Sequence, residues 1–193
     1  DLRYLNLTRN QVADVEPLRG LTALEDLLLA RNAVSDISPL TGLTALRRLD
    51  VSYNAIADLT PVAAMRELQV LNARTNEIAH VQALRALTNL TELNLTENQV
   101  RNVEPLAGLT ELVALSLASN QIADITPLAG LTKLESLSVA RNEIADLSPV
   151  AGMAALTSLA ADYNQLTDAS VVAGLTGLTT LTLRTNQLAD LGP

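Results

Sequence analysis

Aliphatic residues recur along the chain in a unit of 22 residues. In the second unit they stand at positions 24, 27, 29, 34, 37, 40 and 43, and most positions between them are polar or small. All nine units hold Leu, Ile, Val, Met or Ala at the corresponding positions. A fixed period in this range predicts a solenoid, in which each repeat buries its apolar side only against its neighbours. We therefore expect one domain over 1–193, with eight full repeats and a truncated ninth.

Each repeat is expected to hold one short strand and one tight return segment. Leu27 and Leu29 are two residues apart, so both side chains point to the same side of a strand, toward the core. Because all repeats run in the same direction, the strands form a parallel sheet and the chain returns on the opposite side. Ser38 and Pro39 predict the start of a 3₁₀ or single-turn helix, with Ser38 as its N-cap, and Gly42 predicts a left-handed residue at its end.

An asparagine stands three residues after the second inward position of the strand in every repeat. Its short amide side chain can both donate and accept hydrogen bonds. A column of such residues can therefore satisfy the loop backbone between successive turns. We expect this structural ladder at Asn10, Asn32, Asn54, Asn76, Asn98, Asn120, Asn142, Asn164 and Asn186.

The pattern Leu-x-x-Leu-x-Leu-x-x-Asn-x-Ile/Val resembles that of leucine-rich repeats. The 22-residue length and the tail Asp-Ile-x-Pro-Leu-x-Gly-Leu-Thr look like the bacterial internalin subtype, and are also similar to a eukaryotic protein-phosphatase regulatory subunit. The resemblance covers the whole chain. It implies an α/β solenoid, a curved right-handed superhelix with a concave parallel β-sheet and short 3₁₀ or helical turns on the convex side. It also implies a module that acts through protein–protein contact.

The composition excludes several kinds of site. There is no Cys and only one His, which excludes disulfides, thiolate zinc sites and Cys nucleophiles. A net charge of −8 and only three aromatic residues argue against nucleic-acid binding. The charge-free stretch 169–183 is shorter than the ~20 apolar residues of a membrane-spanning helix. No catalytic triad, metal set or phosphate loop is recognisable in the sequence, so we expect neither enzymatic activity nor a cofactor.

The residues beside the inward leucines are expected to face outward on the concave side. Counting repeats from the first ladder Asn, repeats 1 to 4 carry large, cationic and aliphatic residues there, whereas repeats 6 and 7 carry mainly Ala and Ser. Neighbouring strands are about 4.8 Å apart, so these side chains share one surface. Exposed aliphatic residues beside Tyr and Arg are typical of interface hot spots. We predict that a protein partner binds at Leu28, Arg31, Arg48, Asp50, Tyr53, Val70 and Arg74.

A smaller, secondary patch is predicted at Arg141, Asp162, Tyr163 and Arg184. The alternative for both patches is a solvated sheet surface without a partner. The alternative for the whole chain is a structural spacer or scaffold segment of a larger bacterial surface or signalling protein. In that case substitutions on the concave face would have no effect, and deletion of whole repeats would.

His80 is the residue most suggestive of catalysis, because it replaces an Asp found in seven other repeats. Asp58 and Asn102 are expected on either side of it, but no nucleophile is predicted nearby, so we interpret His80 as a polar turn residue. The Asp column also invites a calcium site. An Asp just before a short helical turn more simply accepts loop N–H groups, and we expect that role rather than metal binding. The column consists of Asp14, Asp36, Asp58, Asp124, Asp146, Asp168 and Asp190.

Two repeats and both ends depart from the pattern. Repeats 4 and 8 replace a core leucine with Ala73 and Ala161 and lack the turn proline, so we expect them to open first. No polar cap precedes Leu2 and the sequence stops within a repeat at Pro193. We therefore expect an uncapped part of a longer chain, or alternatively self-association through the uncapped ends. The sequence does not fix the cellular location, although the surface or exterior of a bacterium is slightly favoured over the cytoplasm.

Overall fold

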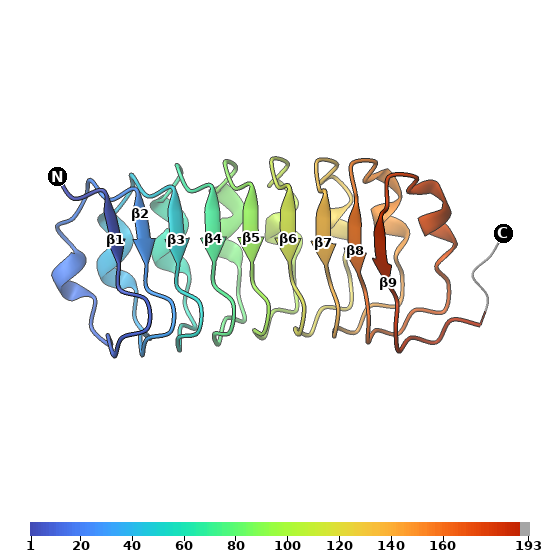
Figure 1. The fold of residues 1–193 in the computed structure, drawn as a ribbon, viewed down its shortest axis with the longest axis horizontal. Coiled ribbons are helices and arrows are strands. Elements are labelled where there is room, and N and C mark those ends of the chain that lie inside the picture. Colours follow the sequence, from blue (N-terminus) through green and yellow to red (C-terminus); the bar gives the residue numbers. More distant parts are fainter. Residues whose placement is uncertain (190–193) are drawn as a thin grey trace.

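Short strands stack side by side in chain order along the molecule (Figure 1). The computed structural model describes residues 1–189, and in this range nine strands form one sheet in which every pairing is parallel. The strands are β1 (Tyr4–Asn6), β2 (Asp26–Leu28), β3 (Arg48–Asp50), β4 (Val70–Asn72), β5 (Glu92–Asn94), β6 (Ala114–Ser116), β7 (Ser136–Ser138), β8 (Ser158–Ala160) and β9 (Thr180–Thr182). This sheet confirms the predicted solenoid of parallel strands.

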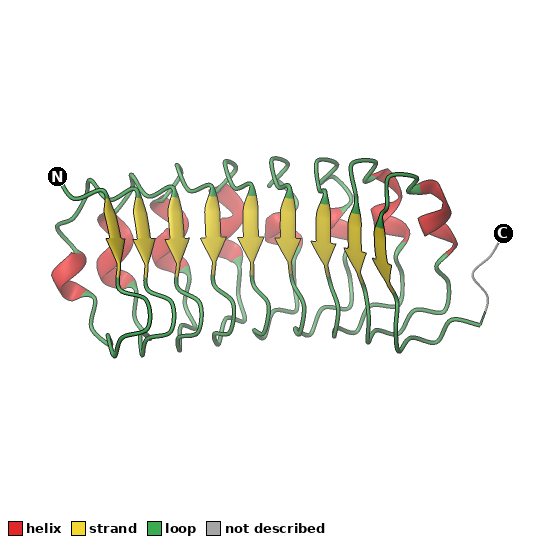
Figure 2. Ribbon diagram, viewed as in Figure 1, coloured by secondary structure: helices red, strands yellow, loops and turns green. Residues whose placement is uncertain are grey.

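The return segments are 3₁₀ helices that lie behind the row of strands (Figure 2). They are η1 (Glu16–Leu18), η2 (Ser38–Gly42), η3 (Thr60–Ala64), η4 (Gln82–Ala86), η5 (Glu104–Leu106), η6 (Thr126–Leu128), η7 (Ser148–Gly152) and η8 (Ser170–Gly174). All except η4 and η8 carry a proline in the first two positions, where its fixed φ is already close to helical. Within residues 1–189 no helix has both the length and the apolar character needed to cross a membrane.

Aliphatic columns fill the space between the sheet and the 3₁₀ helices. In repeat 2, Leu24, Leu27, Leu29 and Leu40 are 0% exposed, and the equivalent residues of repeat 3 stack on them. Burial of each such side chain contributes about 1.5–3 kcal/mol. None of the three tyrosines belongs to this core. The aromatic residues are therefore left for the surface.

Two details of the predicted return segment are wrong. Ser38 is not the N-cap but the first residue of η2, and the cap residue Ile37 makes no side-chain capping bond. Asp36 supplies that bond instead, because its Oδ1 accepts the Ser38 N–H at 2.7 Å. Gly42 is not left-handed, and a Cβ at this position would meet no atom within 4 Å. The end of η2 therefore does not require glycine.

The left-handed residue lies directly before the ladder Asn in each repeat. Nine repeats have φ between 53° and 58° at this position, and none of the nine residues is Gly or Asn. The conformation costs an L-residue roughly 1–2 kcal/mol, so the surrounding structure must hold it. These residues are Arg9, Arg31, Tyr53, Thr75, Glu97, Ser119, Arg141, Tyr163 and Thr185.

Asn98 shows how the ladder connects consecutive repeats. Its Nδ2 donates to the Leu95 carbonyl of its own repeat and to the Ala73 carbonyl of the previous repeat, both at 3.0 Å. Its Oδ1 accepts the Ile78 N–H of the previous repeat at 3.0 Å. Asn10, in the first repeat, donates only to carbonyls of its own repeat in the described part of the chain. The three contacts of Asn98 recur at Asn32, Asn54, Asn76, Asn120, Asn142, Asn164 and Asn186.

Candidate partner-binding face

Tyr53 lies between two arginines at the edge of the outer face of the sheet, which we term the sheet face. The guanidinium carbon of Arg31 is 4.1 Å from the centre of the Tyr53 ring, and that of Arg74 is 5.5 Å from it. Both distances fall in the range of cation–π attraction. The two arginines belong to the repeats before and after Tyr53, so the repeat geometry holds the half-buried ring in place without a partner.

The other predicted residues lie on adjoining strands. Arg48 of β3 is in register with Val70 of β4, and Leu28 of β2 is in register with Asp50 of β3. The two aliphatic side chains are half-buried, and Arg48 is exposed. The structure thus brings these four residues together on three neighbouring strands, beside the edge that carries Tyr53.

Asp50 and Arg74 already have partners within the chain. Asp50 Oδ1 accepts the Ser52 N–H at 3.0 Å and the Ser52 hydroxyl at 2.7 Å, so this carboxylate holds the turn after β3. Arg74 Nη2 donates to Glu97 Oε1 at 2.6 Å. Hydrogen bonds from the Thr75 hydroxyl and then from Arg74 lower the pKa of Glu97. Both side chains therefore already make hydrogen bonds within the chain, which the sequence does not reveal.

Arg31 and Arg48 are the patch cations without an acidic partner in the described part of the chain. The ion pairs there use other cations, namely Arg3, Arg19, Arg74, Arg85 and Lys133. A carboxylate on a partner would therefore meet Arg31 or Arg48 without first breaking an internal ion pair.

The sheet face is hollowed next to the patch. A depression of about 210 Å³ begins at Arg48 and Val70 and continues across β5 and β6, where Glu92, Ala114 and Ser116 line it. Beyond Glu92 the outward side chains that line it are small, namely Ala114 and Ser116. These residues of repeats 5 and 6 lie outside the patch predicted from the sequence in repeats 1 to 4. The decrease in side-chain size along the aligned repeats is the signal that would have found them.

The secondary patch repeats the stacked pair five repeats further along the chain. The guanidinium carbon of Arg141 is 4.2 Å from the centre of the Tyr163 ring, and Tyr163 is 45% exposed. Asp162 accepts the Arg184 N–H at 2.7 Å and also the Thr182 hydroxyl, so it connects two repeats. The structure therefore joins Arg141 with Tyr163, whereas Asp162 serves the backbone and the side chain of Arg184 stays exposed.

Comparison with known proteins identifies the repeat. Family models described as leucine-rich repeats match residues 22–64 and 110–152, with two copies in each range, and residues 86–103. The chain belongs to the leucine-rich repeat family. The internalin InlF from Listeria monocytogenes is 41% identical, with a TM-score of 0.96 over 98% of this chain and 56% of InlF. The Listeria internalin C2 is 35% identical, with a TM-score of 0.88 over 93% of this chain and 80% of that protein.

These matches make the chain an internalin-like leucine-rich repeat protein that spans little more than half of InlF. A plant peptide hormone receptor, RGFR1, whose structure is a complex with RGF2, shares the fold at 22% identity and a TM-score of 0.85, over 96% of this chain and 32% of the receptor. No curated protein sequence matches the chain. Leucine-rich repeat proteins generally serve as protein-interaction scaffolds.

The Asp column of this leucine-rich repeat protein precedes the 3₁₀ helices. Five of its carboxylates accept the N–H of the Ser or Thr two residues further on, which confirms the expected turn role; they are Asp36, Asp58, Asp124, Asp146 and Asp168. The pKa of all five is lowered, mainly by the Ser or Thr hydroxyl at Asp58, Asp124 and Asp146 and by the N–H at Asp36 and Asp168. No acid or His cluster suited to a metal occurs within residues 1–189. Asp190 lies outside the described residues.

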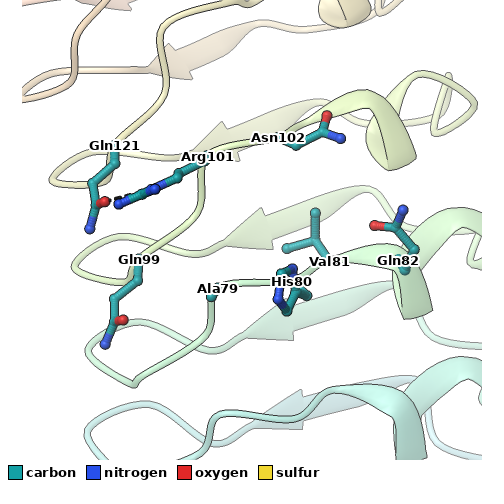
Figure 3. Close-up of a pocket in the computed structure, with 8 residues that line it drawn as sticks. All are labelled: Ala79, His80, Val81, Gln82, Gln99, Arg101, Asn102 and Gln121. Carbon is teal, nitrogen blue, oxygen red and sulfur yellow. Dashed lines mark hydrogen bonds between the residues drawn. The ribbon is translucent and has the colours of Figure 1, made fainter.

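His80 lines a pocket among the loops that lead from the strands to the 3₁₀ helices (Figure 3). This loop pocket has a volume of about 630 Å³ and is lined by residues 79–82, 99, 101, 102 and 121. Asn102 takes over the turn role of Asp, since its Oδ1 accepts the Glu104 N–H at 2.8 Å. Asp58, expected on the other side of His80, does not line the pocket. The lining holds no hydroxyl or thiol that His80 could activate.

Proposed function

We propose that this leucine-rich repeat protein is a non-enzymatic binding module that holds a protein partner on the sheet face of repeats 1 to 4. The observation that carries the proposal is the position of Tyr53 between Arg31 and Arg74. Burying a held aromatic ring costs less side-chain entropy than burying a mobile one. Tyr and Arg are also the residues most enriched among interface hot spots.

The neighbours of Tyr53 specify the chemistry of the partner. Leu28 and Val70 offer aliphatic surface, and the depression beside Val70 can take a protruding side chain. Arg31 and Arg48 are the cations ready to pair with acidic groups. The expected partner surface is therefore an apolar protrusion flanked by carboxylates.

The test begins with paired capture from a protein extract. One bait is the 193-residue chain, and the other carries Arg31→Ala, Arg48→Ala and Tyr53→Ala together. A protein retained by the first bait and lost by the second is then purified and titrated against single variants by calorimetry. Tyr53→Ala is expected to cost more than about 1 kcal/mol of binding free energy.

Tyr163→Ala is the matched control, because this tyrosine has the same stacked arginine at the other end of the sheet. Because the proposal places the partner on repeats 1 to 4, the affinity of this variant is expected to be unchanged, and a loss of affinity would show that the secondary patch binds the partner as well. Equal affinity of the Tyr53→Ala variant and the parent chain would remove Tyr53 from the interface. Binding that is insensitive to all three substitutions but lost on deletion of a repeat would favour the spacer function instead.

A further inference from the structure

The loop pocket has the size and lining of a small-ligand site. Its volume of about 630 Å³ lies within the ~300–1,000 Å³ typical of such sites. The half-buried Ala79 and the exposed ring of His80 supply apolar surface, whereas Val81 is only 1% exposed. Figure 3 shows Arg101 and Gln121 together at one end of the pocket, with the ring of His80 between that end and Gln82. The pocket therefore has an apolar middle and a cationic end.

Arg101 is held in a position to receive an anion. Its Nε donates to Gln121 Oε1 at 2.8 Å, and in the described part of the chain its Nη1 and Nη2 have no hydrogen-bond partner. Two parallel N–H donors of one guanidinium match the two oxygens of a carboxylate. The equivalent position in every other repeat holds Ala, Ser or Thr, so Arg101 is a departure that the repeat itself does not require.

The Asp column is interrupted at the same pocket. His80 and Asn102 replace Asp in consecutive repeats, and no acidic residue is among those that line the pocket. Asn102 keeps the turn bond through Oδ1 but presents an amide NH₂ where Asp would present a second anionic oxygen. His80 makes no bond to the Gln82 N–H, whereas Asp124 bonds the equivalent Thr126 N–H at 2.7 Å. At His80, repeat 4 thus lacks both the hydrogen bond to the N–H two residues further on and the negative charge that Asp supplies in other repeats.

From this arrangement we infer that the loop pocket binds a monocarboxylate attached to an apolar body. The carboxylate pairs with Nη1 and Nη2 of Arg101, and the apolar body lies over Ala79 and the ring of His80. Asp58 and Asp124, in the flanking repeats, disfavour a dianion such as phosphate in a protein whose net charge is −8. The ligand is either a small free acid or the carboxyl end of a peptide chain.

The two sources are separated by nuclear magnetic resonance titration of the ¹⁵N-labelled 193-residue chain. Phenylacetate represents a free acid, N-acetylphenylalanine represents a chain end, and N-acetylphenylalanine amide is the neutral match. Both acids are expected to shift amide signals of residues 79–82 and 99–102, and the amide is not. Tighter binding of phenylacetate assigns the site to free acids, and tighter binding of N-acetylphenylalanine assigns it to chain ends.

Variants test the role of each group. Arg101→Gln is expected to weaken binding at least tenfold, and Arg101→Lys less, because it keeps the charge without the paired donors. Asn102→Asp retains the turn acceptor and is expected to weaken binding several-fold by charge repulsion. Arg66→Gln, a cationic change outside the pocket lining, is the matched control. A circular dichroism melt confirms that each variant is folded.

Three results would overturn the inference. They are equal shifts with the neutral amide, unchanged binding by Arg101→Gln, and shifts centred on the sheet face instead of the loop pocket. Tyr53→Ala is expected to leave the titration unchanged, because Tyr53 is not among the residues that line the loop pocket. The test of carboxylate binding at the loop pocket can therefore fail or succeed independently of the test of partner binding at the sheet face.

Discussion

The guanidinium carbon of Arg31 lies 4.1 Å from the centre of the Tyr53 ring, which belongs to the next repeat. Arg141 and Tyr163 form the same pair at 4.2 Å, five repeats away. In both pairs the two residues occupy the left-handed position of consecutive repeats. Recurrence at two places indicates that the backbone of the repeat sets the stack, and that it exists before any partner binds.

The Arg31–Tyr53 stack should contribute a measurable coupling energy. A double-mutant cycle with Arg31→Gln and Tyr53→Leu is expected to give about 0.5–1 kcal/mol, measured by urea unfolding. A parallel cycle with Arg48→Gln and Tyr53→Leu is the control, because Arg48 does not stack on that ring. Zero coupling in the first cycle would show that the stack adds no stability.

Loss of a ladder Asn in the middle of the chain should destabilise the fold strongly. Asn98→Ala removes the acceptor of the Ile78 N–H and leaves that N–H unpaired, at a cost of about 1–3 kcal/mol. The Ala73 and Leu95 carbonyls each keep one Asn donor from a neighbouring rung, so their loss is smaller. We expect about 3 kcal/mol in total by urea unfolding.

Asn10→Ala is the matched control for the ladder. Asn10 accepts no N–H from another repeat within the described residues, so its loss should cost less than about 1 kcal/mol. An equal loss of unfolding free energy in Asn10→Ala and Asn98→Ala would mean that the ladder does not stabilise the fold through contacts between repeats.

Glycine should stabilise the chain at the left-handed position and destabilise it in a strand. Ser119 has a φ of 56°, so Ser119→Gly relieves backbone strain and is expected to raise the free energy of unfolding by about 0.5 kcal/mol. Ser116 lies three residues earlier in β6 without a positive φ, and Ser116→Gly is expected to lower that free energy by about 0.5–1 kcal/mol. Thermal melts compare the two variants. Effects of the same sign would contradict a strained turn.

Acidification should weaken the fold through the Asp column. The pKa values of Asp124 and Asp146 are lowered in the folded protein, below the value of about 3.9 expected in the unfolded chain. Their contribution is therefore present in full above about pH 5 and is lost as the pH falls through the folded pKa. Asp124→Asn with Asp146→Asn keeps the turn acceptors but cannot titrate. The urea midpoint of this variant should fall less than that of the parent chain between about pH 5 and pH 2.5, and identical curves would refute the assignment.

Repeat 4 should exchange its amide hydrogens faster than repeat 6. The two repeats lie equally far from the ends of the nine-repeat row, so end fraying affects both alike. Repeat 4 has Ala73 where repeat 6 has Leu117, and its Gln82 N–H lacks a carboxylate acceptor of the kind that Asp124 provides for the Thr126 N–H. Hydrogen exchange with mass spectrometry measures the difference. Greater protection in repeat 4 would show that these local losses do not control opening.

The outline of the fold follows from the sequence because the spacing of apolar residues determines which side chains are buried. The spacing of Leu27 and Leu29 places both in the core, and the 22-residue repeat carries this pattern along the sheet. The turn signals were less reliable. Ser38 and Gly42 have residue types favoured at helix caps, but in the structure Asp36 supplies the acceptor and no glycine is required. Several residue types can occupy these positions, so type alone did not settle their roles.

The candidate sites depended more on tertiary structure. The aligned repeats indicated which residues of repeats 1 to 4 face outward, but not that Arg74 is paired with Glu97 or that Asp50 holds its own turn. The loop pocket was not predicted either, although Arg101 stands out in the alignment of repeats. Such contacts join side chains whose rotamers depend on all of their neighbours at once.

The sequence by itself determined the repeat, the parallel sheet and the aliphatic core. The spacing of apolar residues fixes which side of each strand is buried away from water. Only the tertiary structure decided how Tyr53 is held. Its left-handed backbone has no glycine signal, and the surrounding repeats impose that conformation. The stacking of Arg31 on the ring, and the hydrogen bond that holds Arg101 against Gln121 at the loop pocket, likewise arise from contacts between repeats.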